Sequence, residues 1–233
     1  MSQLVIFDFD GTLFDTYEAI EHSIRLTFQE LLPIHPPPSP AAIRPLVSTG
    51  APPGDTFRAL HPDPGAFDET RWVPRYREIY AIHSQARTRP YPAARQVLHA
   101  LRAQNQPVAI ISNKAAAAVT AALEKSDLLD YIPEDLILGY GVPGVERKPD
   151  PSSFTDILLP RLKAHVGADW TAEGRVLMVG DTLTDIHYAR NIGAQVCWCR
   201  YGQGDQEACE ALQPDYIIDA LEEVLALVKG QAP

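Results

Sequence analysis

Four short apolar runs constrain the fold of this chain most, because polar residues stand at or soon after the end of each. They read LVIFDF (4–9), PVAIIS (107–112), DLILGY (135–140) and RVLMVG (175–180). Their length and their valine and isoleucine content predict buried strands. Helical patterns lie between them, and AQVCWC (194–199) and DYIID (215–219) add two further predicted strands. Strands that alternate with helices predict a parallel sheet, so the fold class is α/β.

Residues 16–89 separate the first predicted strand from the others. Ile20, Ile24 and Phe28 recur there at helical spacing, and prolines interrupt the rest of the segment. We therefore predict a core domain of residues 1–15 and 90–233. Residues 16–89 would be inserted into it as a helical cap over the sheet, with hinges near Thr16 and Arg89.

Prolines also predict where individual helices begin or bend. Pro52 and Pro53 are expected in the first turn of a helix, where a missing backbone N–H costs little. Pro74 predicts a helix start or a kink. A helix that begins at 150–151 should break or kink at Pro160, within an unusually long linker (158–175).

Charge and composition exclude several classes of function. The formal net charge of −10 argues against nucleic-acid binding, which needs a basic surface, and means that an anionic ligand needs a locally positive site or a metal. No apolar run approaches the roughly 20 residues of a membrane span, and we expect no leader segment. Cys197, Cys199 and Cys209 are odd in number, which favours reduced thiols in the cytoplasm.

The polar residues at the strand ends predict a single site. In open α/β sheets, ligands bind outside the carboxyl ends of the strands, and the ends of adjacent parallel strands lie close together. The first, second and fourth runs are followed at once by polar groups, and a lysine follows the third. The residues are Asp8, Asp10, Ser112, Asn113, Lys114, Lys148, Asp181 and Asp185.

These residue types favour phosphate chemistry. Asp8 and Asp10 project the same way from extended backbone, and two carboxylates about 4 Å apart repel by about 4 kcal/mol at an effective dielectric constant near 20. A hard cation such as Mg²⁺ would offset this repulsion. Asp8 could attack phosphorus, Asp10 could transfer protons, and Lys148 could bind a phosphate oxygen.

Each motif has a simpler interpretation when it is taken alone. The acids of FDFDGT could cap a turn, and Asp181 and Asp185 could do the same. Ser112 and Asn113 could cap a helix, and Lys148 could be a solvated surface residue. The functional interpretation depends on all four motifs standing at strand ends in one order.

The four motifs resemble those of haloacid dehalogenase superfamily phosphatases. Asp8-Phe9-Asp10-Gly11-Thr12 is similar to the first motif, Ser112 to the second, Lys148 to the third, and Gly180-Asp181-Thr182 with Asp185 to the fourth. The resemblance implies a Rossmann-like sheet, a helical cap, and Mg²⁺-dependent phosphoryl transfer through an aspartyl-phosphate.

The resemblance also implies a role for each matching residue. Asp8 is implied as nucleophile and metal ligand, and Asp10 as general acid and base that also binds metal through its backbone carbonyl. Asp181 and Asp185 complete the implied metal ligands. The groups implied to contact substrate phosphate are Phe9, Gly11, Thr12, Ser112, Asn113 and Lys148.

The branch of the superfamily is less sharply defined than the superfamily itself. Asp10 argues against a dehalogenase, because dehalogenases lack this second acid. The stretches around 89–114 and 179–194 look like those of phosphoglycolate phosphatases, so we expect a small phosphorylated metabolite as partner and a monomer or homodimer. The alternatives are a phosphomutase of the β-phosphoglucomutase type, a phosphatase for sugar phosphates or nucleotides, and a binding module without turnover.

The cap offers one candidate specificity loop. Arg44, Ser48, Thr49 and Gly50 lie where such caps often present residues to the substrate. Three arginines in a later predicted cap helix are expected on a solvated face instead. They are Arg71, Arg75 and Arg77.

Overall fold

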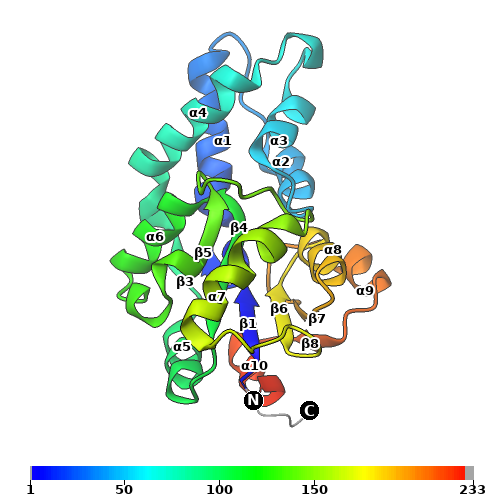
Figure 1. Ribbon diagram of the computed structural model, residues 1–233. Coiled ribbons are helices and arrows are strands. Elements are labelled where there is room, and N and C mark those ends of the chain that lie inside the picture. Colours follow the sequence, from blue (N-terminus) through cyan, green and yellow to red (C-terminus); the bar gives the residue numbers. More distant parts are fainter. Residues whose placement is uncertain (1, 229–233) are drawn as a thin grey trace.

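The computed structural model describes residues 2–228 and has a six-stranded sheet at its centre. All neighbouring strands are parallel, in the order β5-β4-β1-β6-β7-β8 (Figure 1). The predicted α/β class is therefore confirmed. The strands are β1 (Leu4–Phe7), β4 (Val108–Ala115), β5 (Ile137–Tyr140), β6 (Val176–Gly180), β7 (Gln195–Cys199) and β8 (Tyr216–Ile218).

Helices cover both faces of this sheet, which explains why its central strand has no polar residue. In β1, Val5 and Phe7 belong to one apolar cluster and Leu4 and Ile6 to another, because successive side chains point to opposite faces. The first cluster includes residues of α5 (Ala94–Ala103), α6 (Ala116–Lys125) and α10 (Val224–Val228). The second includes residues of α7 (Leu159–Val166), α8 (Leu183–Asn191) and α9 (Gln206–Ala211).

A separate group of helices stands above the carboxyl ends of the strands (Figure 1). These cap helices are α1 (Tyr17–Leu31), α2 (Pro40–Val47), α3 (Pro53–Leu60), α4 (Glu69–Ile79) and the π-helical turn η2 (Tyr80–Ser84). They share an aromatic core in which the rings of Phe28 and Trp72 lie 4.8 Å apart. The short antiparallel strands β2 (Phe14–Asp15) and β3 (Arg89–Pro90) join them to the sheet.

The structure tests the helix boundaries that prolines predict. Pro52 is the N-cap residue of α3 and Pro53 its first residue, as predicted. Pro74 begins no helix: α4 starts at Glu69, where the Asp68 side chain accepts a hydrogen bond from the Thr70 amide, and the helix continues through the proline. This costs α4 one internal hydrogen bond.

At Pro160 the winding of the helix changes. A π-helical segment, η6 (Ser153–Leu158), precedes α7, and Pro160 lies in the first turn of α7. Wider winding is one way for a helix to accommodate an irregularity without ending. The predicted disturbance therefore takes the form of altered winding, and the chain stays helical from Ser153 to Val166.

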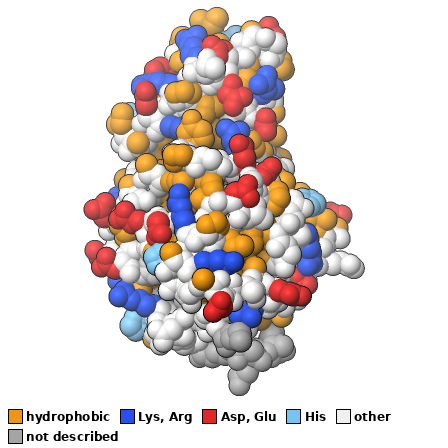
Figure 2. Space-filling model, in the orientation of Figure 1, with side chains coloured by type: hydrophobic (Ala, Val, Ile, Leu, Met, Phe, Trp, Pro, Cys, Tyr) orange, Lys and Arg blue, Asp and Glu red, His pale blue; other side chains and the backbone are white. Residues whose placement is uncertain are grey.

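The cysteine thiols, the helix lengths and the surface charges can each be compared with the sequence. Cys197, Cys199 and Cys209 are all buried and free of disulfides, and burial raises the pKa of each thiol, which keeps them protonated. Within residues 2–228, no helix is both long and apolar enough for a bilayer crossing. Figure 2 shows basic and acidic side chains interspersed over one face of the molecule.

Because helices cover both faces of the sheet, side chains of its central strands should contribute more to stability than those of its edge strand. Leu177 in β6 is fully buried, so Leu177→Ala should lower the free energy of unfolding by about 2–5 kcal/mol, measured by urea denaturation. Ile217 in the edge strand β8 is 42% exposed, so Ile217→Ala should cost less than about 1 kcal/mol. Equal losses for the two variants would contradict a core centred on β6.

Candidate active site

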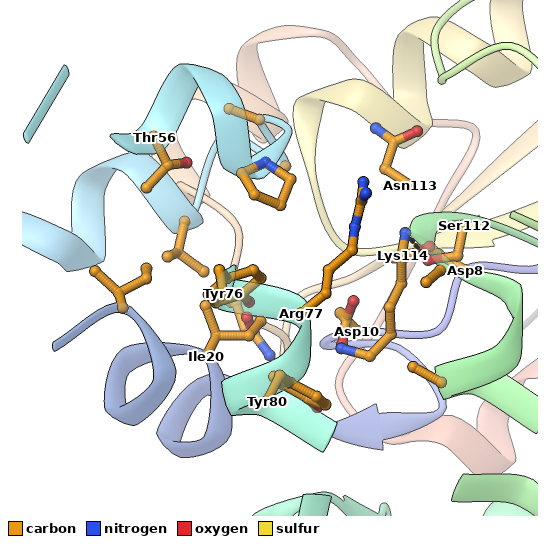
Figure 3. A pocket seen from close by; sticks show the side chains of 18 of the residues that line it. Asp8, Asp10, Ile20, Thr56, Tyr76, Arg77, Tyr80, Ser112, Asn113 and Lys114 are labelled. Carbon is orange, nitrogen blue, oxygen red and sulfur yellow. Dashed lines mark hydrogen bonds and ion pairs between the residues drawn. The ribbon is translucent and has the colours of Figure 1, made fainter. Parts of the chain in front are cut away.

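A cavity of about 410 Å³ lies between the cap helices and the carboxyl edge of the sheet. Its lining brings together residues that stand far apart in the sequence. Those from the predicted site are Asp8, Asp10, Ser112, Asn113, Lys114, Lys148 and Asp185, with Gly50 from the cap. Figure 3 shows Asp8, Ser112 and Lys114 on one side of the cavity and the cap residues Ile20 and Tyr76 on the other.

Asp8 follows directly after β1, and the sheet fixes its backbone. Its amide donates a hydrogen bond to the Val179 carbonyl at 2.9 Å, which continues the pairing of β1 with β6. Its carboxylate accepts a hydrogen bond from Lys148 Nζ at 2.7 Å. Burial raises the pKa of Asp8 to about 7, although Lys148 acts in the opposite direction. The carboxylate thus needs positive charge nearby to remain ionised.

Lys148 holds two acids at once. Its ammonium group lies 2.7 Å from Asp8 and 2.6 Å from Asp185. Burial alone would lower the pKa of Lys148, but the two carboxylates outweigh it and the pKa is raised. Lys148 therefore remains a cation although it is almost completely buried.

Asn113 at the end of β4 positions the Lys148 backbone. Its Oδ1 accepts a hydrogen bond from the Lys148 amide at 2.8 Å, and its Nδ2 donates to the Lys148 carbonyl at 3.3 Å. This pair of bonds ties the loop that follows β5 to β4. The contact of Asn113 with substrate phosphate stays a prediction, whereas its contact with the Lys148 backbone is observed.

Asp181 is enclosed from several directions after β6. Its carboxylate accepts hydrogen bonds from Thr12 Oγ1 at 3.0 Å and from the Gln203 amide at 2.7 Å. A Cβ atom added to Gly11 or Gly202 would overlap Asp181, so only glycine permits this approach. Burial raises the pKa of Asp181 well above its usual value. Thr12 therefore orients the Asp181 carboxylate, and its contact with substrate phosphate stays a prediction.

Asp185 contacts both Thr182 at the N-terminus of α8 and the ammonium group of Lys148. Its Oδ2 accepts hydrogen bonds from the amide and the hydroxyl of Thr182, which caps the N-terminus of α8. Its Oδ1 contacts Lys148. The capping interpretation and the functional interpretation of Asp185 are thus both compatible with its position.

Three of these acids could hold a divalent cation together. Asp8, Asp181 and Asp185 are all buried, and each offers one oxygen that lies within 4.8 Å of the other two. Carboxylate oxygens are the ligands that Mg²⁺ prefers, and a cation would offset the repulsion between these buried carboxylates. The residues present therefore fit the ion.

The Asp10 side chain lies outside that group and pairs with Lys114. The two charged atoms are 2.9 Å apart, and the Lys114 Nζ also lies 4.0 Å from the centroid of the Tyr80 ring. Burial would lower the pKa of Lys114, but Asp10 outweighs it and the pKa is raised. The sequence placed Lys114 at the end of the strand, but nothing in it indicated the pairing with Asp10 or the contact with a cap residue.

The candidate specificity loop contacts the core at one point. Gly50 lines the cavity, and the Thr49 carbonyl accepts a hydrogen bond from Thr184 Oγ1 at 2.9 Å. Arg44 belongs to α2 rather than to a loop, and its guanidinium packs 4.1 Å from the centroid of the Tyr17 ring. Ser48, the C-cap residue of α2, donates a hydrogen bond to the Pro45 carbonyl of that helix. Of these four residues, Gly50 alone lines the cavity.

Arg77 departs from its expected place on a solvated face. It is half-buried and lines the cavity, and its guanidinium lies 3.4 Å from the centroid of the Tyr140 ring at the end of β5. Arg75, two positions earlier, does lie on the outside, where it pairs with Glu30 and Glu78. The contact between Arg77 and Tyr140 joins a cap helix to the core, so the spacing within α4 alone could not predict it.

Comparison with known proteins agrees with the arrangement of these motifs. A family model described as haloacid dehalogenase-like hydrolase matches residues 5–199, which contain all four motifs. The chain belongs to this family. It is 30% identical over 230 residues to a phosphoglycolate phosphatase of Thiobacillus denitrificans, covering 96% of this chain and 94% of that one. It is also 31% identical over 231 residues to a phosphoglycolate phosphatase of Nitrosospira multiformis, covering 97% and 95%.

A solved structure supports the same family assignment. A haloacid dehalogenase-like hydrolase of Streptococcus pneumoniae superimposes with a TM-score of 0.77 at 25% identity, covering 97% of this chain and 98% of that one. The resemblance to the phosphoglycolate phosphatase branch of the haloacid dehalogenase-like hydrolases is thus confirmed. Gln203, which binds Asp181, lies beyond the matched residues and was not predicted from any motif.

The approach of Gly11 to Asp181 gives a matched pair of glycine variants. Gly11→Ala and Gly174→Ala both place alanine at positive φ, which costs on the order of 1 kcal/mol. Only Gly11→Ala also displaces Asp181, because no atom of residues 2–228 lies within 4 Å of a Cβ added at Gly174. We expect Mg²⁺ to raise the unfolding temperature of the wild type and of Gly174→Ala, but hardly that of Gly11→Ala. An equal Mg²⁺ response in all three proteins would contradict the metal role of Asp181.

Proposed function

We propose that this chain hydrolyses a small phosphomonoester in a Mg²⁺-dependent reaction that proceeds through an aspartyl-phosphate on Asp8. One observation carries the proposal. The Asp8 carboxylate lies at the cavity, 2.7 Å from a buried lysine and within 4.8 Å of two further buried acids. A carboxylate in such surroundings is suited to attack phosphorus, because the neighbouring positive charge also binds the phosphate oxygens.

In the first half of the reaction, an Asp8 oxygen forms a bond to phosphorus while the bond from phosphorus to the ester oxygen breaks. Asp10 in its protonated form donates a proton to that ester oxygen, which leaves as an alcohol. In the second half, Asp10 takes a proton from water, the water oxygen attacks phosphorus, and Asp8 is released together with inorganic phosphate. Lys114, whose Nζ lies 2.9 Å from Asp10 Oδ1, positions the Asp10 side chain beside the cavity.

Lys148 and Ser112 are proposed to bind the oxygens of the phosphoryl group. Asp8, Asp181, Asp185 and the Asp10 carbonyl would hold Mg²⁺, which when bound neutralises the charge that gathers between the acids and the phosphate. Phe9, Gly11 and Thr12 shape the turn that carries Asp8 and Asp10. The cap helices would exclude water from the cavity before the first step.

Phosphoglycolate is the first substrate to test, because relatives of nearly equal length carry the name phosphoglycolate phosphatase. We propose a small phosphorylated metabolite as the partner and the cytoplasm as the compartment, which the three free thiols support. We propose no role for nucleic acid or membrane, and either a monomer or a homodimer. Release of inorganic phosphate, rather than of an isomerised sugar phosphate, would separate a phosphatase from a phosphomutase.

Replacement of the nucleophile tests the covalent step. Asp8→Asn should lower kcat with a generic phosphomonoester on the order of a thousandfold or more, because an amide oxygen is a poor nucleophile. The matched control is Asp15→Asn, which alters an exposed acid of the same opening stretch and should retain wild-type activity. Substantial phosphate release by Asp8→Asn would exclude Asp8 as the nucleophile.

The loss of rate in the first step caused by Asp10→Asn should depend on the leaving group of the substrate. An alkoxide needs a proton as it leaves, whereas p-nitrophenolate does not. We therefore expect this variant to lose on the order of a hundredfold in the first step with an alkyl phosphate, and far less with p-nitrophenyl phosphate. The amount of phosphorylated enzyme after rapid mixing measures that step. Equal losses with both esters would argue that Asp10 transfers no proton to the leaving group.

Removal of the metal tests the proposed Mg²⁺ dependence. Dialysis against EDTA should abolish phosphate release, and added Mg²⁺ should restore it, because three buried carboxylates would otherwise repel the incoming phosphate. Full activity in EDTA would contradict the Mg²⁺ dependence while leaving the fold and family assignment intact.

A further inference from the structure

The cavity has two chemically different ends. The charged groups of the core gather at one end, around Asp8 and Lys148. The opposite wall is built mainly from apolar side chains of the cap, with small side chains of α6 continuing it along the core. We call this part of the cavity the apolar chamber; its walls are Ile20, Val47, Tyr76 and Ala118, bordered by the almost completely buried side chains of Ile24 and Phe57. In Figure 3 the chamber residues Ile20 and Tyr76 lie on the opposite side of the pocket from Asp8 and Ser112, with the Arg77 side chain drawn between the two groups.

The charged groups of the cavity offer little to a second anionic group on the substrate. Three cationic side chains line the cavity: Arg77, Lys114 and Lys148. Lys148 is held by Asp8 and Asp185, and Lys114 is held by Asp10. The Arg77 guanidinium is stacked on the half-exposed ring of Tyr140, which is not among the residues that line the cavity. A carboxylate placed against the chamber walls would therefore lie mainly against apolar carbon, where burial of a charge without a partner is costly.

The volume of the cavity leads to the same conclusion. Its size of about 410 Å³ falls in the range of roughly 300–1,000 Å³ that is usual for pockets holding drug-sized ligands. A phosphoryl group with a two-carbon remainder would leave much of the chamber empty. Phe57 and Ile24, which border the chamber, belong to the packed aromatic and aliphatic core of the cap, so single side chains have little freedom to turn inward and fill the space.

We propose that the preferred substrate carries an apolar body of several carbon atoms on its phosphate ester, and that this body lies in the apolar chamber. This inference rests on the proposed phosphatase function and narrows its substrate class. The driving force is the transfer of apolar surface from water to the chamber walls, which favours each buried methylene group. Phosphoglycolate would then be hydrolysed as a short substrate that leaves the chamber unused.

A series of linear alkyl phosphates tests the proposal. Ethyl, butyl and hexyl phosphate have leaving groups of nearly equal acidity, so differences in kcat/KM report contacts with the alkyl chain. We expect kcat/KM to rise by about two- to fourfold for each added methylene group, and hexyl phosphate to exceed phosphoglycolate. Phosphate release in the presence of Mg²⁺ is the measurement.

Two variants of one helix provide the matched control. Val47 and Leu46 are both half-buried residues of α2, and only Val47 lines the cavity. Val47→Asn should flatten the increase with chain length, measured as the ratio of kcat/KM for hexyl and ethyl phosphate within the same variant. Leu46→Asn should keep the full increase. The same loss of the increase in both variants would overturn the assignment of the chamber as the site of the alkyl chain.

A binding measurement separates failure of the substrate class from failure of the function. Calorimetry with Asp8→Asn compares the affinities for hexyl and ethyl phosphate without turnover. Turnover of all esters with flat or falling kcat/KM would overturn the apolar substrate and leave the phosphatase function standing. No turnover of any ester, with tighter binding of hexyl phosphate, would overturn the function and keep the chamber. Equal binding and no turnover would overturn both.

Discussion

The site depends on one electrostatic constraint, which is that three buried carboxylates must share a small volume. Asp8, Asp181 and Asp185 bring oxygens within 4.8 Å of one another, and the ammonium group of Lys148 lies against two of them. One lysine cannot neutralise three acids, so the cluster is ready for a further cation and for a substrate bound through it. Burial, and after it the neighbouring carboxylates, raises the pKa of Asp8 and of Asp181.

The surrounding structure holds this unfavourable cluster in place. Asn113 fixes the Lys148 backbone, Thr12 and the Gln203 amide fix Asp181, and the N-terminus of α8 fixes Asp185. These partners come from separate segments that meet only at the carboxyl edge of the sheet. Because the parallel strands set the backbone positions, the acids need little reorganisation to react, which is the usual advantage of a preorganised site. The core thus supplies the chemistry, and the cap supplies the walls around the rest of the substrate.

Much of this arrangement follows from the sequence, because a simple rule connects sequence to space in parallel sheets. Residues that directly follow adjacent strands must meet, so Asp8, Ser112 and Asp181 could be assigned to one edge before any coordinates. The pairing of Lys114 with Asp10 and the support from Gln203 could not be assigned in this way. Lys114 and Asp10 are 104 residues apart, and Gln203 lies 22 residues after Asp181 in a segment that no motif marks. Arg77 was misplaced for a related reason: the pattern of α4 shows which residues are charged, but only the packing of the cap over β5 places Arg77 beside Tyr140.

The sequence by itself determined the fold class, the family and the set of acids at the strand ends, because apolar periodicity and motif order are local properties of the chain. Only the tertiary structure decided which acid faces which lysine, because side chains at one edge can pair in several ways and packing selects among them. It alone also decided the character of the cavity opposite the acids. Helical spacing marks Ile20 and Ile24 as apolar, but whether they face a core or a substrate depends on how closely the cap approaches the sheet.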